Sequence, residues 1–339
     1  MYLFYNMSNT IILNSSNLIG INNSQFQYNF PQGSYTIPDG SEICVSQITI
    51  PYSFFNISAS LGNNTFSYVM PTTASTTATK VITLSDGFYD IPALNKALQA
   101  SLYANNYFFY NNALGSVSTG TSNPNIIYPI QFVSNYSNYN NQIQFQYIPT
   151  SSGNVVNQFG TGWVWALGTY PTNAQTPQII VPQQNGVNIS GSTYGFGNII
   201  GFTNATYPSA TIYYGGSTTF STNTPTLANS VPYSVSGNSL TSSPPFAPLG
   251  TYVNGLLVRC SIVENLVNAN SDVMDCVPIT STFGSNINYS PISDNWVKVK
   301  PGKFQNIVIT FCDQNYNLLK ANDPNVLISL LVRFPPAKK

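Results

Sequence analysis

The sequence predicts an all-β protein of the sandwich or jelly-roll class, with one short helix and long connections. Aromatic residues make up 14% of the chain, chiefly 23 Tyr and 20 Phe, and such side chains fit the pleated, half-buried surface of a sheet. Short apolar segments also alternate with loops rich in Gly, Pro, Ser and Thr, as in sandwiches and jelly rolls. With 42% hydrophobic residues among 339, the chain can build a large core.

Five segments have the patterns of strands. Segment 41–51 is rich in β-branched residues and ends at a proline. In segment 142–148, three large apolar side chains alternate with glutamines, which predicts a half-buried antiparallel strand. A polar turn at 313–317 begins the connection between the last two strands. Longer apolar runs predict strands in a sandwich core at 256–263, 304–312 and 326–334.

One segment has the period of a helix instead. Asp90 is a good N-cap, and Pro92 lies in the first turn, where its missing N–H is not needed. We expect a helix at 91–103 whose apolar stripe packs on the sheet. The stripe consists of four residues at helical spacing, namely Ile91, Leu94, Leu98 and Leu102.

Charged residues are scarce and unevenly placed. They make up 6% of the chain, against about 25% in ordinary soluble domains, and ten basic residues balance ten acidic ones. None lies between Lys96 and Arg259. A surface with so few charges repels its neighbours weakly and suits a protein packed against other copies or other subunits. An AT-rich genome, which raises the Asn, Tyr and Ile content, is a compatible contributing cause. Small and polar residues crowd three loops, at 71–79, 115–125 and 215–248.

The final segment, 291–339, is the most basic part of the chain. It carries seven Lys or Arg residues and three Asp residues, and it could face nucleic acid or an acidic neighbour. We prefer the plainer interpretation, a solvated C-terminal edge. The seven basic residues are Lys298, Lys300, Lys303, Lys320, Arg333, Lys338 and Lys339.

The four cysteines are widely spaced, with no CxxC pair. Cys44, Cys260 and Cys312 lie in apolar runs and are expected to be small buried hydrophobic residues, whereas Cys276 does not. The N-terminus has no basic region typical of a signal peptide, and no apolar stretch is long enough to predict a transmembrane helix. We therefore expect synthesis in the cytosol, with reduced thiols.

The composition argues against an enzyme. Because the chain has no His, it cannot build a Ser-His-Asp triad or a Cys-His pair. Asp90 is better explained as a helix cap, and Asp39 and Asp313 as turn residues. We expect no catalytic, cofactor-binding or metal-binding residues and no cofactor. Three carboxylate pairs could contribute to a metal site, but none has EF-hand spacing: Asp39 with Glu42, Asp86 with Asp90, and Asp272 with Asp275.

Three segments look functional at first sight. The glycine-rich segment 195–201 superficially resembles a phosphate-binding loop, but it lacks the lysine, and we expect a turn at the mouth of a strand. The aromatic cluster at 103–110 could stack bases or sugars. It has no interleaved Lys or Arg, which favours core packing or subunit contact. Trp163 and Trp165 could form sugar-binding platforms, although burial is the preferred interpretation.

An ordered series of short motifs resembles the penton (vertex) and minor capsid proteins of virophages, polinton-like viruses and related large DNA viruses. The resemblance spans roughly residues 40–334 and rests on the order of the motifs, because each motif is short. Besides the helix with Leu94 and Leu98, the motifs are Ile50–Ile57, Gly62–Phe66, Ser85–Ile91, Asn198–Phe202, Leu257–Ser261 and Phe304–Leu319.

The resemblance implies a single jelly roll that forms a homopentamer at each fivefold vertex, beside a major capsid protein with a double jelly roll and possibly minor capsid proteins. It implies a virion protein made in the host cytoplasm or viral factory. No catalytic residues carry over. We expect four regions: an N-terminal arm (1–30), the first part of the jelly roll (31–104), an uncharged insertion (105–250) and the second part (251–339).

Two other functions remain open at this stage. The first is another virion component, either a trimeric spike or a minor cement protein. The second is a carbohydrate- or receptor-binding jelly roll. Nucleic acid could be contacted only through the basic C-terminal segment, and no membrane insertion is expected.

Overall fold

The computed structural model describes residues 8–73, 75–114, 125–136, 140–182, 195–202, 204–209, 213–214, 253–266 and 270–335. These residues form two compact units. The first unit takes the described residues up to Phe55 and from Val253 onward, and the second takes those from Asn56 to Tyr214. The second unit is therefore an insertion into the first. None of the helices in the described part of the chain has the length and apolar character of a membrane span.

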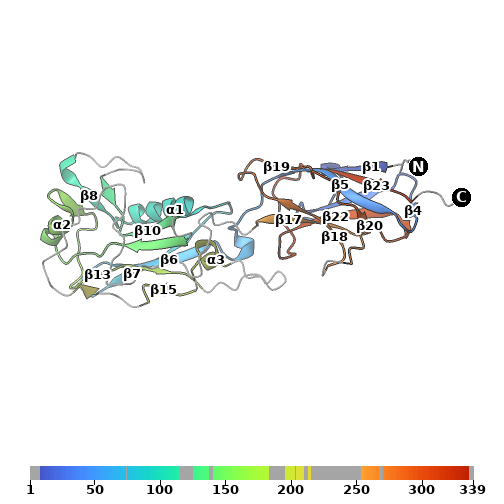
Figure 1. The fold of residues 1–339 in the computed structure, drawn as a ribbon. Coiled ribbons are helices and arrows are strands. Elements are labelled where there is room, and N and C mark those ends of the chain that lie inside the picture. Colours follow the sequence, from blue (N-terminus) through green and yellow to red (C-terminus); the bar gives the residue numbers. More distant parts are fainter. Residues whose placement is uncertain are drawn as a thin grey trace. The chain divides into compact units, whose positions relative to one another are not determined.

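The first unit is a jelly roll. Its eight main strands form two antiparallel sheets, ordered β1-β23-β5-β19 and β18-β17-β22-β3 (Figure 1). Numbered along the chain, the orders are 1-8-3-6 and 5-4-7-2, the interleaved pattern of a double Greek key. The strands are β1 (Ser8–Asn14), β3 (Gln25–Asn29), β5 (Glu42–Pro51), β17 (Gly255–Cys260), β18 (Val273–Pro278), β19 (Asn286–Tyr289), β22 (Asn306–Cys312) and β23 (Leu327–Arg333).

Short elements complete this unit. β2 (Leu18–Ile19) extends the second sheet beyond β3, and β20 (Val297–Lys298) pairs with β5. β4 (Tyr35–Ile37) and β21 (Gly302–Phe304) form a separate ladder. A 3₁₀ turn, Ser15–Asn17, links β1 to β2.

Strand β23, near the C-terminus, is the central partner in the first sheet. It pairs with β1 over seven positions, from Ser8 opposite Arg333 to Asn14 opposite Leu327. On its other side it pairs with β5, with an irregularity between Ser329 and Leu330. Alternate residues of β23 are buried, and β5 buries five of its ten residues, namely Ile43, Cys44, Val45, Ile48 and Ile50. The predicted strands at 41–51, 256–263, 304–312 and 326–334 are confirmed within a few residues.

The core of the jelly roll lies between its two sheets. Phe26 of β3 and Phe311 of β22 pack edge to face, with ring centroids 6.0 Å apart, and both are fully buried. Leu13 of β1 and Ile48 of β5 are likewise inaccessible to solvent. The alternation along each strand thus brings large apolar side chains from all parts of the chain into one core.

The second unit combines small sheets with three helices. Its largest sheet has the order β15-β14-β6-β7, and three smaller ladders are β10-β11, β12-β8-β9 and β13-β16. Its elements are β6 (Thr65–Pro71), β7 (Thr77–Thr83), α1 (Ile91–Ala104), β8 (Phe109–Asn111), β9 (Ile126–Ile127), β10 (Ile130–Asn135), β11 (Asn140–Phe145), α2 (Ser152–Phe159), β12 (Trp163–Trp165), β13 (Ala174–Gln175), β14 (Gln178–Ile180), α3 (Phe196–Ile200), β15 (Thr206–Tyr207) and β16 (Tyr213–Tyr214), with 3₁₀ turns at Ala59–Leu61 and Asn112–Leu114.

Helix α1 forms as the sequence predicts. The Asp90 carboxylate accepts a hydrogen bond from the Ala93 N–H at 2.8 Å, which caps the first turn. All four residues of the predicted apolar stripe are buried. The helix packs along β10 (Figure 1), where the Phe132 N–H donates to the Asn95 side chain at 2.9 Å. This contact fixes the position of the helix on that strand.

Several expectations differ from the structure. Residues 56–104, expected in the jelly roll, belong to the second unit, and the described residues of the expected arm form strands β1 to β3. The described chain holds three α-helices rather than one. The alternation at 142–148 ends at Phe145, the last residue of β11, since Tyr147 is only partly buried and Ile148 is buried. The loops at 115–124 and 215–248 lie outside the described residues.

Truncating Leu98 to Ala should destabilise the second unit by about 2–5 kcal/mol, since the side chain is fully buried and leaves a cavity. In a Trp296→Phe background the two remaining tryptophans, Trp163 and Trp165, both report on this unit, so urea unfolding followed by fluorescence measures the loss. The exposed Lys96→Ala is the matched control on the same helix and should change stability by less than about 0.5 kcal/mol. Equal effects of the two variants would contradict the assigned helix orientation.

Candidate assembly surfaces

The predicted carboxylate pairs have structural partners rather than a shared site. Asp272 holds Arg259 with two oxygens, at 3.0 Å to Nε and 2.7 Å to Nη2. Asp86 accepts the Ala59 N–H at 2.7 Å, while Asp90 caps α1. Among the described residues, no group of three or more His, Cys, Asp or Glu could hold a metal ion.

Asp313 and Asp39, which the sequence predicts as turn residues, both lie in turns. Asp313, only 2% exposed, accepts the N–H groups of Asn315 and Asn317 at 2.8 and 2.9 Å, and its second oxygen accepts the Asn317 side-chain amide. These bonds confirm that Asp313 shapes the turn after β22. Asp39 lies in the turn before β5, 3.8 Å from the Lys298 ammonium, and both of these groups are largely exposed.

Burial keeps the thiols of Cys44 and Cys260 protonated. Burial raises the pKa of Cys44 to about 11 and that of Cys260 to about 12, far from the range of a reactive thiolate. Cys312 is also buried, and Cys276 is exposed. The four cysteines are free, and the predicted burial of three of them is confirmed.

Asp275 has an environment that disfavours its charge. Burial raises the pKa of this carboxyl, and the hydrogen bonds from the Cys276 N–H and the Tyr289 hydroxyl, at 2.8 and 3.1 Å, offset the rise only in part. Burial also raises the pKa of Tyr289 to about 12. The pair links β18 of one sheet to β19 of the other.

Both tryptophans of the second unit are buried. Trp163 is 8% exposed and Trp165 is 0% exposed, so neither offers an open face for a sugar. Trp165 packs on Phe109 with ring centroids 4.6 Å apart, and Phe109 packs on Phe159 at the same distance. Trp163 borders a shallow hollow beside α2, but its buried ring provides no stacking platform. The structure therefore favours the core interpretation of Trp163 and Trp165.

The aromatic and glycine-rich segments also belong to the core. Tyr107, Phe108 and Phe109 are all less than 8% exposed, which confirms core packing for most of the 103–110 cluster. Segment 195–201 forms the short helix α3, which corrects the expected turn. A Cβ at Gly197 would lie 2.3 Å from the Phe202 carbonyl oxygen, so this glycine permits close packing of the chain.

Two basic residues of the C-terminal segment have acidic partners. Arg333 pairs with Glu42 and lies over the Trp296 ring, 4.2 Å from its centroid. Lys298 of β20 lies near Asp39 and opposite Glu42 of β5, whereas Lys303 is on β21. Lys338 and Lys339 lie outside the described residues. The positive charges of Arg333 and Lys298 are thus partly balanced by neighbouring carboxylates.

One outward surface of the jelly roll carries exposed apolar side chains and one charge. Directly opposite residues of β1 and β23 point to the same side, which places seven residues with described side chains on one outer face. Ile12 is 56% exposed and Leu327 is 41% exposed. Arg333, at one end of the face, is the only charged residue in either strand. We call this surface the β1–β23 face; it comprises Thr10, Ile12, Asn14, Leu327, Ser329, Leu331 and Arg333.

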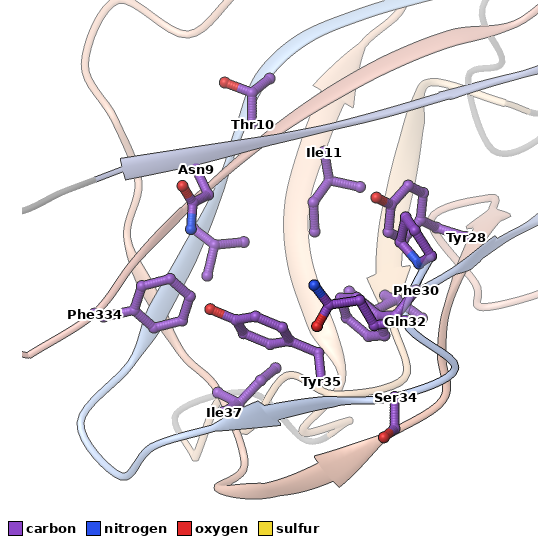
Figure 2. Close-up of a pocket in the computed structure, with 13 residues that line it drawn as sticks. Asn9, Thr10, Ile11, Tyr28, Phe30, Gln32, Ser34, Tyr35, Ile37 and Phe334 are labelled. Atoms are coloured by element: carbon purple, nitrogen blue, oxygen red, sulfur yellow. The ribbon is translucent and has the colours of Figure 1, made fainter.

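An aromatic cavity lies on the other side of the same strands, between the edges of the two sheets (Figure 2). Its volume is about 260 Å³, and none of its lining residues is charged. Phe30 stacks on Tyr35 with centroids 5.4 Å apart, Tyr28 meets Phe30 edge to face at 5.5 Å, and Phe334 lies 5.8 Å from Tyr35. Neither the cavity nor the β1–β23 face was predicted from the sequence. The aromatic residues around position 30 could have indicated the cavity, and the apolar run at 11–13 could have indicated the face.

Comparisons with known proteins found likeness only among solved structures; no family model and no curated protein matches the chain. The crystal structure of the mavirus penton protein is 9% identical, with a TM-score of 0.41, over 97% of this chain and 100% of that one. A chain from the cryo-electron microscopy structure of the Sputnik virophage is 11% identical, with a TM-score of 0.39, over 96% and 97%. The assignment of the fold rests on the strand order described above.

Replacing Asp275 with Asn should make the folded state less sensitive to pH. Because the folded state binds this proton more tightly, the unfolded chain ionises first as pH rises from about 3.8, and stability falls until the raised pKa is passed. The variant should therefore be more stable than the native chain at pH 7, and this advantage should vanish by about pH 3. Urea unfolding across this range measures it.

Proposed function

We propose that this chain is a structural capsid protein that forms the vertex capsomer of an icosahedral double-stranded DNA virus. The observation that carries the proposal is the jelly-roll strand order, 1-8-3-6 over 5-4-7-2, with a second unit inserted between its third and fourth strands. Jelly rolls recur in viral capsids because they hide most strand edges and leave loops at both ends for neighbours.

The motifs of the capsid resemblance have physical roles in this fold. Ile50–Ile57 covers the end of β5 and the start of the second unit, where Ile50 and Ile57 are fully buried. Phe304–Leu319 covers β22 and the turn built on Asp313. The motifs therefore mark the places where the jelly roll receives its insertion and closes its second sheet, which supports a shared architecture.

The surface chemistry suits assembly. Five copies that converge on one axis bring the same residues of each copy near that axis, where like charges would repel. The β1–β23 face carries the exposed apolar side chains of Ile12 and Leu327 and includes the edge strand β1. A ring of five is a heterologous assembly in which one side of each subunit meets a different side of the next. We propose that the β1–β23 face is one of these two sides, in contact with a neighbouring copy or with the major capsid protein.

The proposed role is non-enzymatic and places the protein in the virion, at the vertex, after synthesis in the host cytoplasm or viral factory. Asp90 caps α1, Asp313 shapes the turn after β22, and Asp272 and Glu42 form ion pairs, which supports structural roles for these acidic residues. The buried tryptophans give the carbohydrate-binding alternative no support.

The oligomeric state of the purified full chain tests the vertex proposal. Mass photometry and negative-stain electron microscopy should show rings of five copies, or five copies around each fivefold axis of the particle. Weak contacts dilute out, so the measurement should cover micromolar to submillimolar concentrations. A stable trimer would overturn the vertex assignment in favour of a spike.

Charge placed on the β1–β23 face should block assembly without unfolding the subunit. Ile12→Lys and Leu327→Glu each add a charge at an exposed strand position, so subunit stability should change by about 0.5 kcal/mol or less while assembly falls at least tenfold. Val81→Lys on β7 is the matched control, because Val81 is 66% exposed in the second unit. Assembly that survives both face variants would exclude this surface as a contact.

A further inference from the structure

The direction of the main-chain groups at the outer edge of β1 follows from the ladders beside it. In an antiparallel sheet, successive residues of a strand turn their N–H and C=O groups to alternate sides. The Val299 N–H donates to the Ser41 carbonyl at 3.0 Å, so Ser41 faces away from β23. The next residue, Glu42, therefore faces β23, where it lies opposite Arg333. The alternation then turns Arg333 toward β5 and Val332 toward β1.

Val332 lies opposite Asn9, which sets the direction of the main-chain groups along β1. Asn9 and Ile11 turn their N–H and C=O groups to β23, so those of Thr10 and Ile12 point to the outer edge. Within the part of the chain that the structure describes, no residue hydrogen-bonds to these main-chain groups of Thr10 and Ile12. Each of the two residues therefore offers one donor and one acceptor to an incoming strand.

The other long outer strands carry features that discourage such pairing. In the described structure, three outer strands of the larger sheets have six or more residues, namely β1, β7 and β18. Strand β7 carries Lys80, and β18 has a register shift, the partly buried Asp275 and a terminal Pro278. Charges, bulges and prolines of this kind keep sheet edges from pairing with other chains. Strand β1 has none of them, because its seven residues are uncharged and keep a regular register with β23.

The aromatic cavity lies on the inner side of the same edge. Asn9 and Ile11 point into it, while Thr10 points away (Figure 2). Directly opposite residues of a sheet point to the same side, so a residue added opposite Asn9 or Ile11 would point toward the cavity. The rings of Phe30 and Tyr35 line the cavity, and none of its lining residues is charged. An apolar cavity of about 150 Å³ holds a benzene molecule, so one of about 260 Å³ has room for an aromatic side chain.

We propose that the outer edge of β1 binds an extended, uncharged segment of another protein chain. The segment adds a strand to the first sheet and places one large apolar side chain in the aromatic cavity. The main-chain groups of Thr10 and Ile12 provide affinity for an extended segment, and the cavity selects the side chain. The lack of charge along β1 and in the cavity lining disfavours a charged segment, whose desolvation nothing there would offset. This inference goes beyond the proposed capsid role and does not depend on it.

A synthetic peptide of alternating Thr and Phe, blocked at both ends, tests the site in the full-length chain. Amide hydrogen exchange, followed by NMR on the isotope-labelled chain, should slow about tenfold or more at Thr10 and Ile12 when the peptide is added. The reason is that their N–H groups then become hydrogen-bonded. The amides of Asn9 and Ile11, which already bond to β23, should change by less than about twofold.

Two changes to the peptide separate the main chain from the side chain. Replacing its Phe residues by Ala should weaken binding about tenfold or more, because the cavity is then left unfilled. Methylating the main-chain nitrogens of alternate residues, on the edge that pairs with β1, should abolish binding because the donors are lost. Fluorescence anisotropy of the labelled peptides measures both effects.

Thr10→Pro is the matched variant of the chain. It removes one outward N–H and leaves the ladder with β23 bonded, so the chain should stay folded and bind the peptide about fivefold or more weakly. Thr10→Ala keeps this N–H and should bind the peptide as the native chain does. Equal binding by the two variants would contradict pairing at this edge.

The remaining outcomes also overturn the proposal. An absence of binding at about millimolar peptide would show that the edge takes no strand, and unchanged binding of the methylated peptide would show that the cavity alone holds it. Protection of Thr10 and Ile12 that rises with protein concentration, without peptide, would assign the edge to a second copy instead. These measurements do not require a ring of five copies, so their failure would leave the vertex proposal untouched.

Discussion

The structure depends on the insertion of β23 between β1 and β5. This strand is the last described strand of the chain; it pairs with the first, β1, over seven register positions and with β5 on its other side. The remaining main strands are placed by their pairings, β19 on β5 in the first sheet and β18-β17-β22-β3 in the second, and by the shared core around Phe26 and Phe311. Because β5 and β17 both belong to the jelly roll, the chain leaves the jelly roll after β5 and re-enters it at β17. Pairing strands so far apart in the chain costs loop-closure entropy, which is lost before the stabilising contacts form.

The parts of the fold that the sequence predicts are those with a local signal. The cap at Asp90, the stripe on α1 and the turn at Asp313 each involve residues within a few positions of one another. The buried strands follow because apolar β-branched runs between turn residues have few alternatives. The strand order carries no local signal of this kind. The resemblance in motif order implies only the jelly-roll class, and the structure supplies the strand order through the pairing of β1, β5 and β23.

The boundary of the insertion could not be read in the same way. The stripe on α1 fits any apolar surface, and nothing local says that this surface is β10 rather than a sheet of the jelly roll. The absence of charge begins at Ala97, which suggested a boundary near 105. The compact unit begins instead at Asn56, where the chain still contains Lys80, Asp86, Asp90 and Lys96. Charge content and unit boundary are set by different physical requirements, solvation in one case and burial in the other. The cavity and the β1–β23 face combine residues from distant segments, so local sequence patterns do not predict them.

A protein with so few charges must satisfy its buried polar groups by other means, and the start of the second unit shows how. The Asn56 side chain donates to the Tyr89 carbonyl and accepts the Tyr89 N–H, both at 2.8 Å, while Asn63 donates to the Asn56 carbonyl and accepts the Ser58 N–H. An amide has both donors and an acceptor, so one side chain can complete two backbone bonds without a counter-charge. Neither salt nor pH in the ordinary range changes an amide, whereas exposed ion pairs are screened. The same amide chemistry that joins the segments around Asn56 and Tyr89 leaves the chain with few charges. Internal hydrogen bonding and weak repulsion between copies therefore have a common origin in the Asn-rich sequence.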